Sequence, residues 1–374
     1  MAKISFPYMG ESVVAYKKIG HMLGHEVIEP PKPTQKTVDL GVKHAPEFAC
    51  FPLKVLLGTY LEEIALGADL LMSSGGHGPC RAGYYGEMHR KILRSLGYEG
   101  HLIIFDAPRD HLRDFYQDLK RIKANNSWIY CYHVLKLVYR AIKIMDELEQ
   151  KVSRLRAYEV KTGSVNRAWE QIQELVNQAF TLPQLEAAQK EGHNLLDSLE
   201  MIPVKEERKL RIGIIGEIYV VMENSTNMMM EQKLGELGCE VRRSQYLSDW
   251  IDFNLLPHWI SHPHEAEIQK MGTKYFDIGI GGHARENMGW IDQFSNWGYD
   301  GIVHLLPFGC LPELMSQSII PQVSKDLNLP IISFALDEQS GLANNLTRLE
   351  AFVDLIKAQK FGVKQHILQQ KAAG

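Results

Sequence analysis

Short apolar runs separated by helical stretches recur in both halves of the chain. The first half contains KISFPYMG, HEVIEP, Asp69–Ser73 and His101–Phe105, and the second contains RIGIIG, CEVRRS, FDIGIGG, GIVHLL and PIISFAL. Such runs, alternating with helices, are typical of strands buried on both faces of a parallel sheet. The sequence therefore predicts an α/β fold with two doubly wound, Rossmann- or flavodoxin-like parallel-sheet domains.

The strand pattern stops in the middle of the chain. From Asp110 to about Met201 the segments are rich in Leu, Glu, Lys, Arg, Gln and Ala, which favour helices. A further amphipathic helix is predicted over Asn344–Lys357. The expected organisation is an α/β domain at 1–109, a helical linker or insertion at 110–205, a second α/β domain at 206–345, and a C-terminal helix and tail at 346–374.

Charge and hydropathy restrict the kinds of partner and the cellular location expected for this chain. The 374 residues carry 41 Lys+Arg against 45 Asp+Glu, a formal charge of -4, and neither sign forms a long block. We therefore expect no nucleic-acid or anionic-lipid partner. The opening MAKISFPYMGE lacks the apolar core of a signal peptide, and no apolar run is long enough for a membrane helix. The expected location is the cytoplasm.

Five cysteines in such a chain are not a disulfide framework, because cytoplasmic thiols stay reduced and the count is odd. Cys50 lies in FACFPLK, Cys80 in GGHGPCRAGYYGE and Cys310 in LLPFGCLPELM. Each has a proline immediately before it or two residues after it, and each is predicted to begin a helix. Free N–H groups and the positive end of the helix dipole favour thiolates and other anions there.

Three such cysteines suit a shared anionic iron–sulfur cluster, with one iron left without a protein thiolate. Two alternatives remain open: buried cysteines that pack as small hydrophobes, and zinc held with a histidine such as His77. The chain has no C-x-x-C pair. Cys131 falls in a helical apolar stripe with Leu135, and Cys239 begins a strand, so both are expected to be structural.

Three further side chains are candidates for chemistry beside these cysteines. His77 could donate a hydrogen bond to a cluster sulfur, act as an acid or shape its Gly-rich loop. Arg81 could pair with an anionic substrate or with the cluster, or be a solvated surface residue. Glu313 could accept a proton, although capping of the helix that follows Cys310 is the favoured interpretation.

Two long segments carry a family resemblance. FACFPLKVLLGTYLEEIALGADLLMSSGGHGPCRAGYYGE and GIVHLLPFGCLPELMSQSIIPQVSKDLNLPIISFALDEQSG resemble the D-component of 2-hydroxyacyl-CoA dehydratases and relatives associated with acyl-CoA dehydratase activases. The resemblance implies two α/β domains joined by a helical part. It also implies one 4Fe-4S cluster in the interdomain cleft, held by Cys50, Cys80 and Cys310, with an open or exogenous fourth position.

The resemblance further implies a partner, an ATP-hydrolysing iron–sulfur activase that supplies one low-potential electron in anaerobic metabolism. The chain itself has no G-x-x-x-x-G-K-[ST] loop. In the dehydratases the electron passes to a 2-hydroxyacyl-CoA, and the resulting ketyl radical expels hydroxide. This chain resembles the stand-alone relatives rather than the two-subunit enzymes, so an acyl-CoA or another small molecule is the expected substrate, and a homodimer is compatible.

The expected activity is that of a lyase or reductase component. A non-catalytic 4Fe-4S electron carrier and a zinc or structural protein are the alternatives. A double cubane would require about six thiolates, whereas three cysteines here have the right setting, so a single cubane is expected.

Overall fold

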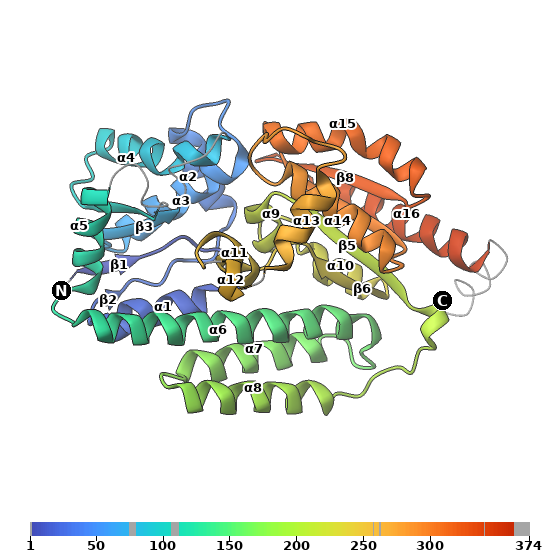
Figure 1. The fold of residues 1–374 in the computed structure, drawn as a ribbon, viewed down its shortest axis with the longest axis horizontal. Helices are drawn as coiled ribbons and strands as arrows, with labels where there is room; N and C mark the ends of the chain where they lie inside the picture. The colour runs from blue at the N-terminus through green and yellow to red at the C-terminus, as the bar shows by residue number, and fades with distance from the viewer. Residues whose placement is uncertain are drawn as a thin grey trace.

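Two four-stranded parallel sheets, one in each half of the chain, organise the fold (Figure 1). The computed structural model describes residues 2–74, 80–105, 112–256, 258–261, 263–339 and 341–362. The strands are β1 Lys3–Ser5, β2 Glu26–Val27, β3 Leu70–Ser74, β4 His101–Phe105, β5 Leu210–Gly216, β6 Cys239–Arg243, β7 Gly301–Pro307 and β8 Ile331–Leu336. The strand orders are β2-β1-β3-β4 and β6-β5-β7-β8. In each sheet the chain adds its second strand on one side of the first strand and then crosses over to add the third strand on the other side, as in a doubly wound fold. The predicted α/β class with two doubly wound sheets is confirmed.

Helices cover both faces of the first sheet. They are α1 Val13–Leu23, α2 Gln35–His44, α3 Phe51–Ala65, the short 3-10 helix η1 Arg81–Tyr84, α4 Tyr85–Ser95 and α5 Leu112–Lys123. In β3, Leu70 and Met72 join a core that includes α1, whereas Leu71 joins a core that includes α3. Because both faces of the strand are buried, its sequence is an apolar run rather than an alternating one.

Three long helices form a layer that lies beneath both sheets (Figure 1). They are α6 Trp128–Leu155, α7 Ser164–Gln178 and α8 Leu182–Asp197. The Ser127 hydroxyl caps α6 by accepting a hydrogen bond from the backbone N–H of Tyr130 at 3.1 Å. Within the described ranges, none of the helices combines the length and apolarity needed to cross a bilayer. The layer occupies the segment for which the sequence predicts helices.

The two cysteines expected to be structural are buried in the cores. Cys131 lies on the inner face of α6 beside Val134, and Cys239 begins β6. Leu135 was expected in the same buried stripe as Cys131, but 57% of its surface is exposed. That part of the prediction is wrong, because the buried face passes through position 134 rather than 135.

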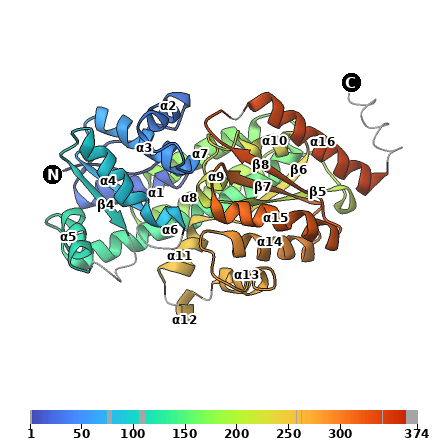
Figure 2. The same cartoon turned by 90° about the horizontal axis from the view of Figure 1, so that it is seen from above.

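The remaining helices belong mostly to the second α/β domain. They are η2 Arg156–Tyr158, η3 Glu206–Arg208, α9 Ile218–Met222, α10 Met230–Glu236, α11 Leu247–Asn254, α12 His258–Ser261, α13 His264–Gly272, α14 Ala284–Asn296, α15 Leu311–Asp326 and α16 Leu342–Phe361. Figure 2 shows α14 and α15 on one side of this sheet and α10 and α16 on the other. The predicted C-terminal helix, α16, contributes Phe352 and Ile356 to the core beneath Ile212 and Val303.

The segment FDIGIGG, residues 276–282, is not a strand, so that prediction is wrong. Ile278 has 67% of its surface exposed, and Gly281 and Gly282 have φ of 81° and 55°. The Arg285 side chain donates hydrogen bonds to the carbonyls of Phe276 and Asp277, at 3.0 and 3.1 Å. These carbonyls are therefore bound by a side chain, and β5 already has strands on both sides.

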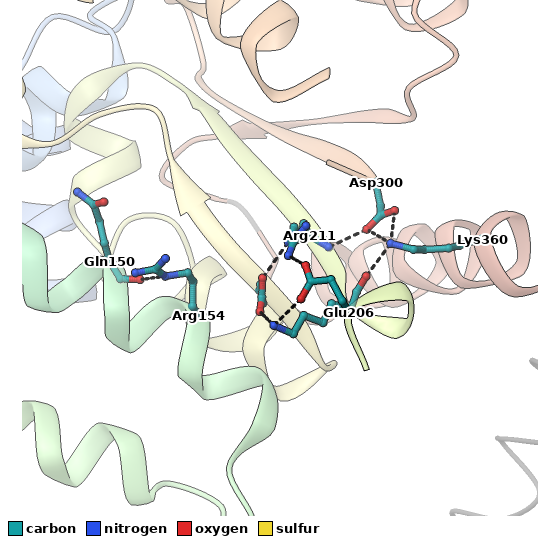
Figure 3. Close-up of polar contacts among 8 residues, drawn as sticks. Gln150, Arg154, Glu206, Arg211, Asp300 and Lys360 are labelled. Atoms are coloured by element: carbon teal, nitrogen blue, oxygen red, sulfur yellow. Dashed lines mark hydrogen bonds and ion pairs between the residues drawn. The ribbon is translucent and has the colours of Figure 1, made fainter. Parts of the chain in front are cut away.

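A network of surface ion pairs fixes the entry of the chain into the second α/β domain (Figure 3). Asp300 accepts a hydrogen bond from the backbone N–H of Arg211 at 2.8 Å and pairs with Lys360 of α16 at 2.7 Å. The Arg211 guanidinium also contacts Glu206 and lies 3.0 Å from Glu240. Because these groups are partly exposed, each pair adds little stability, and the network mainly sets the position of β5 relative to α16.

A pair of glycines lets α2 and α3 cross in close contact. A Cβ placed on Gly58 would lie 1.8 Å from the Thr37 carbonyl oxygen, and one on Gly41 would lie 1.7 Å from the Lys54 carbonyl oxygen. These atoms are backbone and cannot rotate away. The contact holds α3, whose first turn follows Cys50, in its place.

We expect Gly58→Ala to lower the free energy of unfolding by about 1–3 kcal/mol, because the new methyl group must push α2 away from α3. Urea unfolding followed by circular dichroism measures this change. Gly279→Ala is the control, since no atom lies within 4 Å of a Cβ placed on Gly279. Equal stability of the two variants would contradict the close crossing.

Candidate functional site

Cys50, Cys80 and Cys310 each occupy the residue immediately before a helix. Cys50 precedes α3, Cys80 precedes η1, and Cys310 precedes α15, all three with extended backbone angles. None of the three cysteine side chains makes a capping hydrogen bond to its helix. The prediction that each cysteine begins a helix is confirmed. Unpaired N–H groups at a helix start make this a favourable setting for a negatively charged sulfur.

The loops that carry the three cysteines meet at one place. The Arg81 side chain, adjacent to Cys80, donates a hydrogen bond to the carbonyl oxygen of Phe48, two residues before Cys50. A Cβ placed on Gly309, adjacent to Cys310, would lie 3.8 Å from Arg81 Nη1 and 4.0 Å from the Phe48 oxygen. Gly309 has φ of 76°, which glycine adopts without strain. Tertiary structure thus brings both α/β domains together at these cysteines.

The environment keeps two of the free thiols neutral. Cys50 is buried, and burial raises the pKa of its thiol although the Tyr85 hydroxyl, 2.7 Å from Cys50 Sγ, opposes the shift. Burial, and then the charges of Glu313 and Glu217, raise the pKa of Cys310. A bound cation would reverse this balance, because metal ligation deprotonates a thiol.

The three cysteine thiols are candidate ligands for a metal ion or a cluster. Among the described residues, no three His, Cys, Asp or Glu side chains are close enough to hold one metal ion. His77, the histidine proposed for a zinc site, lies outside the described residues. Three thiols at three helix starts fit an anionic iron–sulfur cluster, which is larger than one ion and has several ligand positions.

The matched family model is described as 2-hydroxyglutaryl-CoA dehydratase, D-component, and it covers residues 23–356. The chain belongs to this family. No match was found among curated proteins. The matched range contains all three cysteines, the whole second sheet and every strand of the first sheet except β1, so the chain is a component of the 2-hydroxyacyl-CoA dehydratase type.

In this D-component family member, Glu313 is a core residue beneath Cys310. Its carboxylate accepts a hydrogen bond from Asn287 Nδ2 at 2.8 Å and lies 2.9 Å from His304 Nε2. Asn287 also binds the backbone of Gly216 at the end of β5. The capping interpretation of Glu313 is wrong, because its partners come from α14 and β7 and not from its own helix. Glu313 instead anchors the start of α15 to the second sheet.

Arg81 is exposed but is not a purely solvated residue. Its guanidinium binds the Phe48 carbonyl and lies beside Gly309, so it connects the three cysteine loops. A role for Arg81 or Glu313 in catalysis stays a prediction.

Two further residues of the D-component site were not predicted from the sequence. Tyr85 lies in GYYGE beside a second tyrosine and two glycines, and only folding brings it to Cys50. Glu217 directly follows the strand RIGIIG, and an acidic residue at a strand end could have marked it. Its side chain caps α9, and burial raises its pKa, while the charge of His283 lowers it. Glu217 and Glu313, whose charges raise the pKa of Cys310, both belong to the second α/β domain.

Proposed function

We propose that the chain is an iron–sulfur redox component that binds one 4Fe-4S cluster through Cys50, Cys80 and Cys310. It accepts low-potential electrons from an ATP-hydrolysing iron–sulfur activase and reduces or dehydrates a substrate. The observation that carries the proposal is the meeting of three cysteine loops through Arg81 and the Phe48 carbonyl. Family membership supports the same reaction class.

The chain supplies three thiolates and the positive ends of three helices to the cluster. When bound, a cluster of this kind supplies one-electron reduction at low potential. The helix starts offset the negative charge of the ligands, and Arg81 holds the ligand loops together. With three protein thiolates, one position stays available to a substrate or an exogenous ligand. Cys131 and Cys239 are buried elsewhere, so a single cubane fits the chain and a double cubane does not.

A pocket between the α/β domains favours an enzyme over a pure electron carrier. It has a volume of about 140 Å³ and is lined by Val38 and Phe51 of the first domain and by Thr226 and Glu338 of the second. Phe51 is adjacent to Cys50, and Glu338 pairs with the buried Lys54 of α3 at 2.8 Å. We expect this pocket to receive part of an acyl-CoA or another small substrate.

Exposed aromatic side chains support an electron-donating protein partner. Phe48, Tyr84 and Phe308 are 85%, 70% and 65% exposed, and each lies within four residues of one of the three cysteines. Apolar and aromatic side chains on the surface are typical of protein contact sites. An activase that binds there would reach the cysteine loops directly.

We expect about four irons and four sulfides per chain after anaerobic purification, because a cubane contains four of each. Cys50→Ala, Cys80→Ala and Cys310→Ala should each lose most of this iron, with loss of the visible absorption and of the EPR signal of the reduced protein. Cys131→Ala and Cys239→Ala are matched controls, since these buried cysteines lie away from the three loops, and they should retain it.

Stoichiometric zinc without sulfide would overturn the proposal in favour of a zinc protein. Iron in the wild type that is independent of all three cysteines would overturn the assigned ligands. To separate an enzyme from a carrier, the reduced protein is mixed with 2-hydroxyacyl-CoA substrates. Product formation indicates an enzyme: dehydration is redox-neutral and leaves the cluster reduced, whereas substrate reduction reoxidises it. Reoxidation only by a protein acceptor, with no product, indicates a carrier.

A further inference from the structure

We propose that Tyr85 donates a hydrogen bond to the sulfur of Cys50 and thereby raises the reduction potential of the cluster bound there. The inference rests on the proposed function, and it assigns Tyr85 as a positioning and tuning residue. Tyr85 Oη lies 2.7 Å from Cys50 Sγ, and both side chains are buried.

The direction of this hydrogen bond follows from the chemistry of its two atoms. A metal-bound cysteine is a thiolate and has no proton, whereas a phenol near neutral pH keeps its proton. The phenol must therefore be the donor and the sulfur the acceptor. Because the site is buried, water does not compete for this sulfur, and the hydrogen bond is stronger than it would be at the surface.

Packing fixes the phenol in this position. Tyr85 begins α4, directly after the loop and 3-10 helix that follow Cys80. One turn later, His89 Nε2 lies 3.1 Å from the carbonyl oxygen of Leu53 in the first turn of α3. The rings of Tyr85 and His89 are in contact, with centroids 5.9 Å apart. One face of α4 thus contacts the start of α3 at two points, and one of these points is the Cys50 sulfur.

A donor at this sulfur changes how strongly an added electron is held. Reduction places more negative charge on the cluster and its thiolates, so a hydrogen bond to sulfur stabilises the reduced form more than the oxidised form. No covalent bond forms or breaks in Tyr85, and its proton stays on oxygen. The electron comes from the reductase or, in a titration, from dithionite.

The test is a potentiometric titration with dithionite of wild type and of Tyr85→Phe, followed by EPR, with iron counted in each sample. We expect Tyr85→Phe to retain iron and to have a lower potential. At a fixed applied potential its ratio of reduced to oxidised cluster should fall about tenfold, which corresponds to about 59 mV for one electron. Tyr60→Phe is the control, because the Tyr60 hydroxyl donates to the Met72 carbonyl oxygen at 3.1 Å instead.

A second substitution keeps the inference testable if Tyr85→Phe loses its iron. A fluorinated tyrosine at position 85 has the same shape and is a stronger donor, so it should raise the potential. Unchanged potentials in iron-loaded Tyr85 variants would overturn the inference and leave the proposed cluster intact. A wild-type protein without iron would instead overturn the proposed function.

Discussion

Replacing Arg243 with methionine is expected to lower the free energy of unfolding by about 3–5 kcal/mol, because it leaves two carboxylates buried without their cation. Arg243 lies at the end of β6 and is almost completely buried. Its guanidinium lies 2.5 Å from Glu149 of α6 and 2.9 Å from Glu231 of α10. The ion pairs therefore connect the helical layer to the second α/β domain, and urea unfolding measures the loss.

The loss in Arg243→Met should shrink as the pH falls from 8 to 5. Burial already raises the pKa of Glu149, and the Arg243 charge opposes that increase. Without Arg243 the folded variant binds protons more readily than the unfolded chain does, so acid favours its folded state. Adding Glu149→Gln and Glu231→Gln should restore part of the stability.

Arg242→Met is the matched control for this prediction. Arg242 is the next residue towards the strand start, is only partly buried, and lies 4.9 Å from the ring centre of Trp297. Losing a cation–π contact of this kind is expected to change stability by about 0.5–1 kcal/mol. Equal losses in the two variants would show that Arg243 has no special role in joining the domains.

Glu265→Gln is expected to stabilise the protein at pH 8, by an amount on the order of 3 kcal/mol. Glu265 is buried in α13, and burial, followed by the charges of Glu286 and Asp249, raises its pKa to about 9. At pH 8 Glu265 must take up a proton when the chain folds, whereas a glutamine is neutral at every pH and has no such cost. It can still accept the hydrogen bond that Trp290 Nε1 donates to Glu265 Oε1 at 3.3 Å.

The size of this stabilisation depends on pH. The folded-state pKa of Glu265 lies above its ordinary value of 4.5, so its contribution to stability is fully present below pH 4.5 and is lost as the pH rises towards 9. Wild type and Glu265→Gln should therefore converge near pH 4.5 and separate at higher pH in urea titrations. Glu267→Gln, an exposed change on the same helix, should follow the wild-type curve. A constant offset across this range would contradict the buried, protonated state of Glu265.

Much of the fold follows from local sequence pattern. The apolar runs that form β3, β5 and β7 predict central strands of parallel sheets, because such strands are buried on both faces. FDIGIGG has a similar local composition but is exposed at Ile278 and bound by the Arg285 side chain. Whether an apolar run pairs depends on where the tertiary structure places it relative to the sheet, which local pattern does not contain.

The candidate site likewise has features that local sequence predicts and contacts that only folding produces. Proline at the first or second helical position indicates by itself that helices begin after Cys50 and Cys310, since proline fits the first helical turn. The partners of Glu313, which are His304 and Asn287, come from two other elements and could not be predicted from the residues around Cys310. The same holds for the 2.7 Å contact between Tyr85 and Cys50.

The sequence by itself therefore determined the α/β class and the helix starts at the cysteines, and its choice of these three thiols as cluster ligands stays a prediction. Only the tertiary structure decided that their loops meet through Arg81 and that Tyr85 faces the Cys50 sulfur. The physical reason is the separation along the chain over which each kind of interaction acts. Helix capping, proline geometry and apolar periodicity act within a few residues, whereas the meeting of Cys50, Cys80 and Cys310 depends on strand order and on packing between two domains.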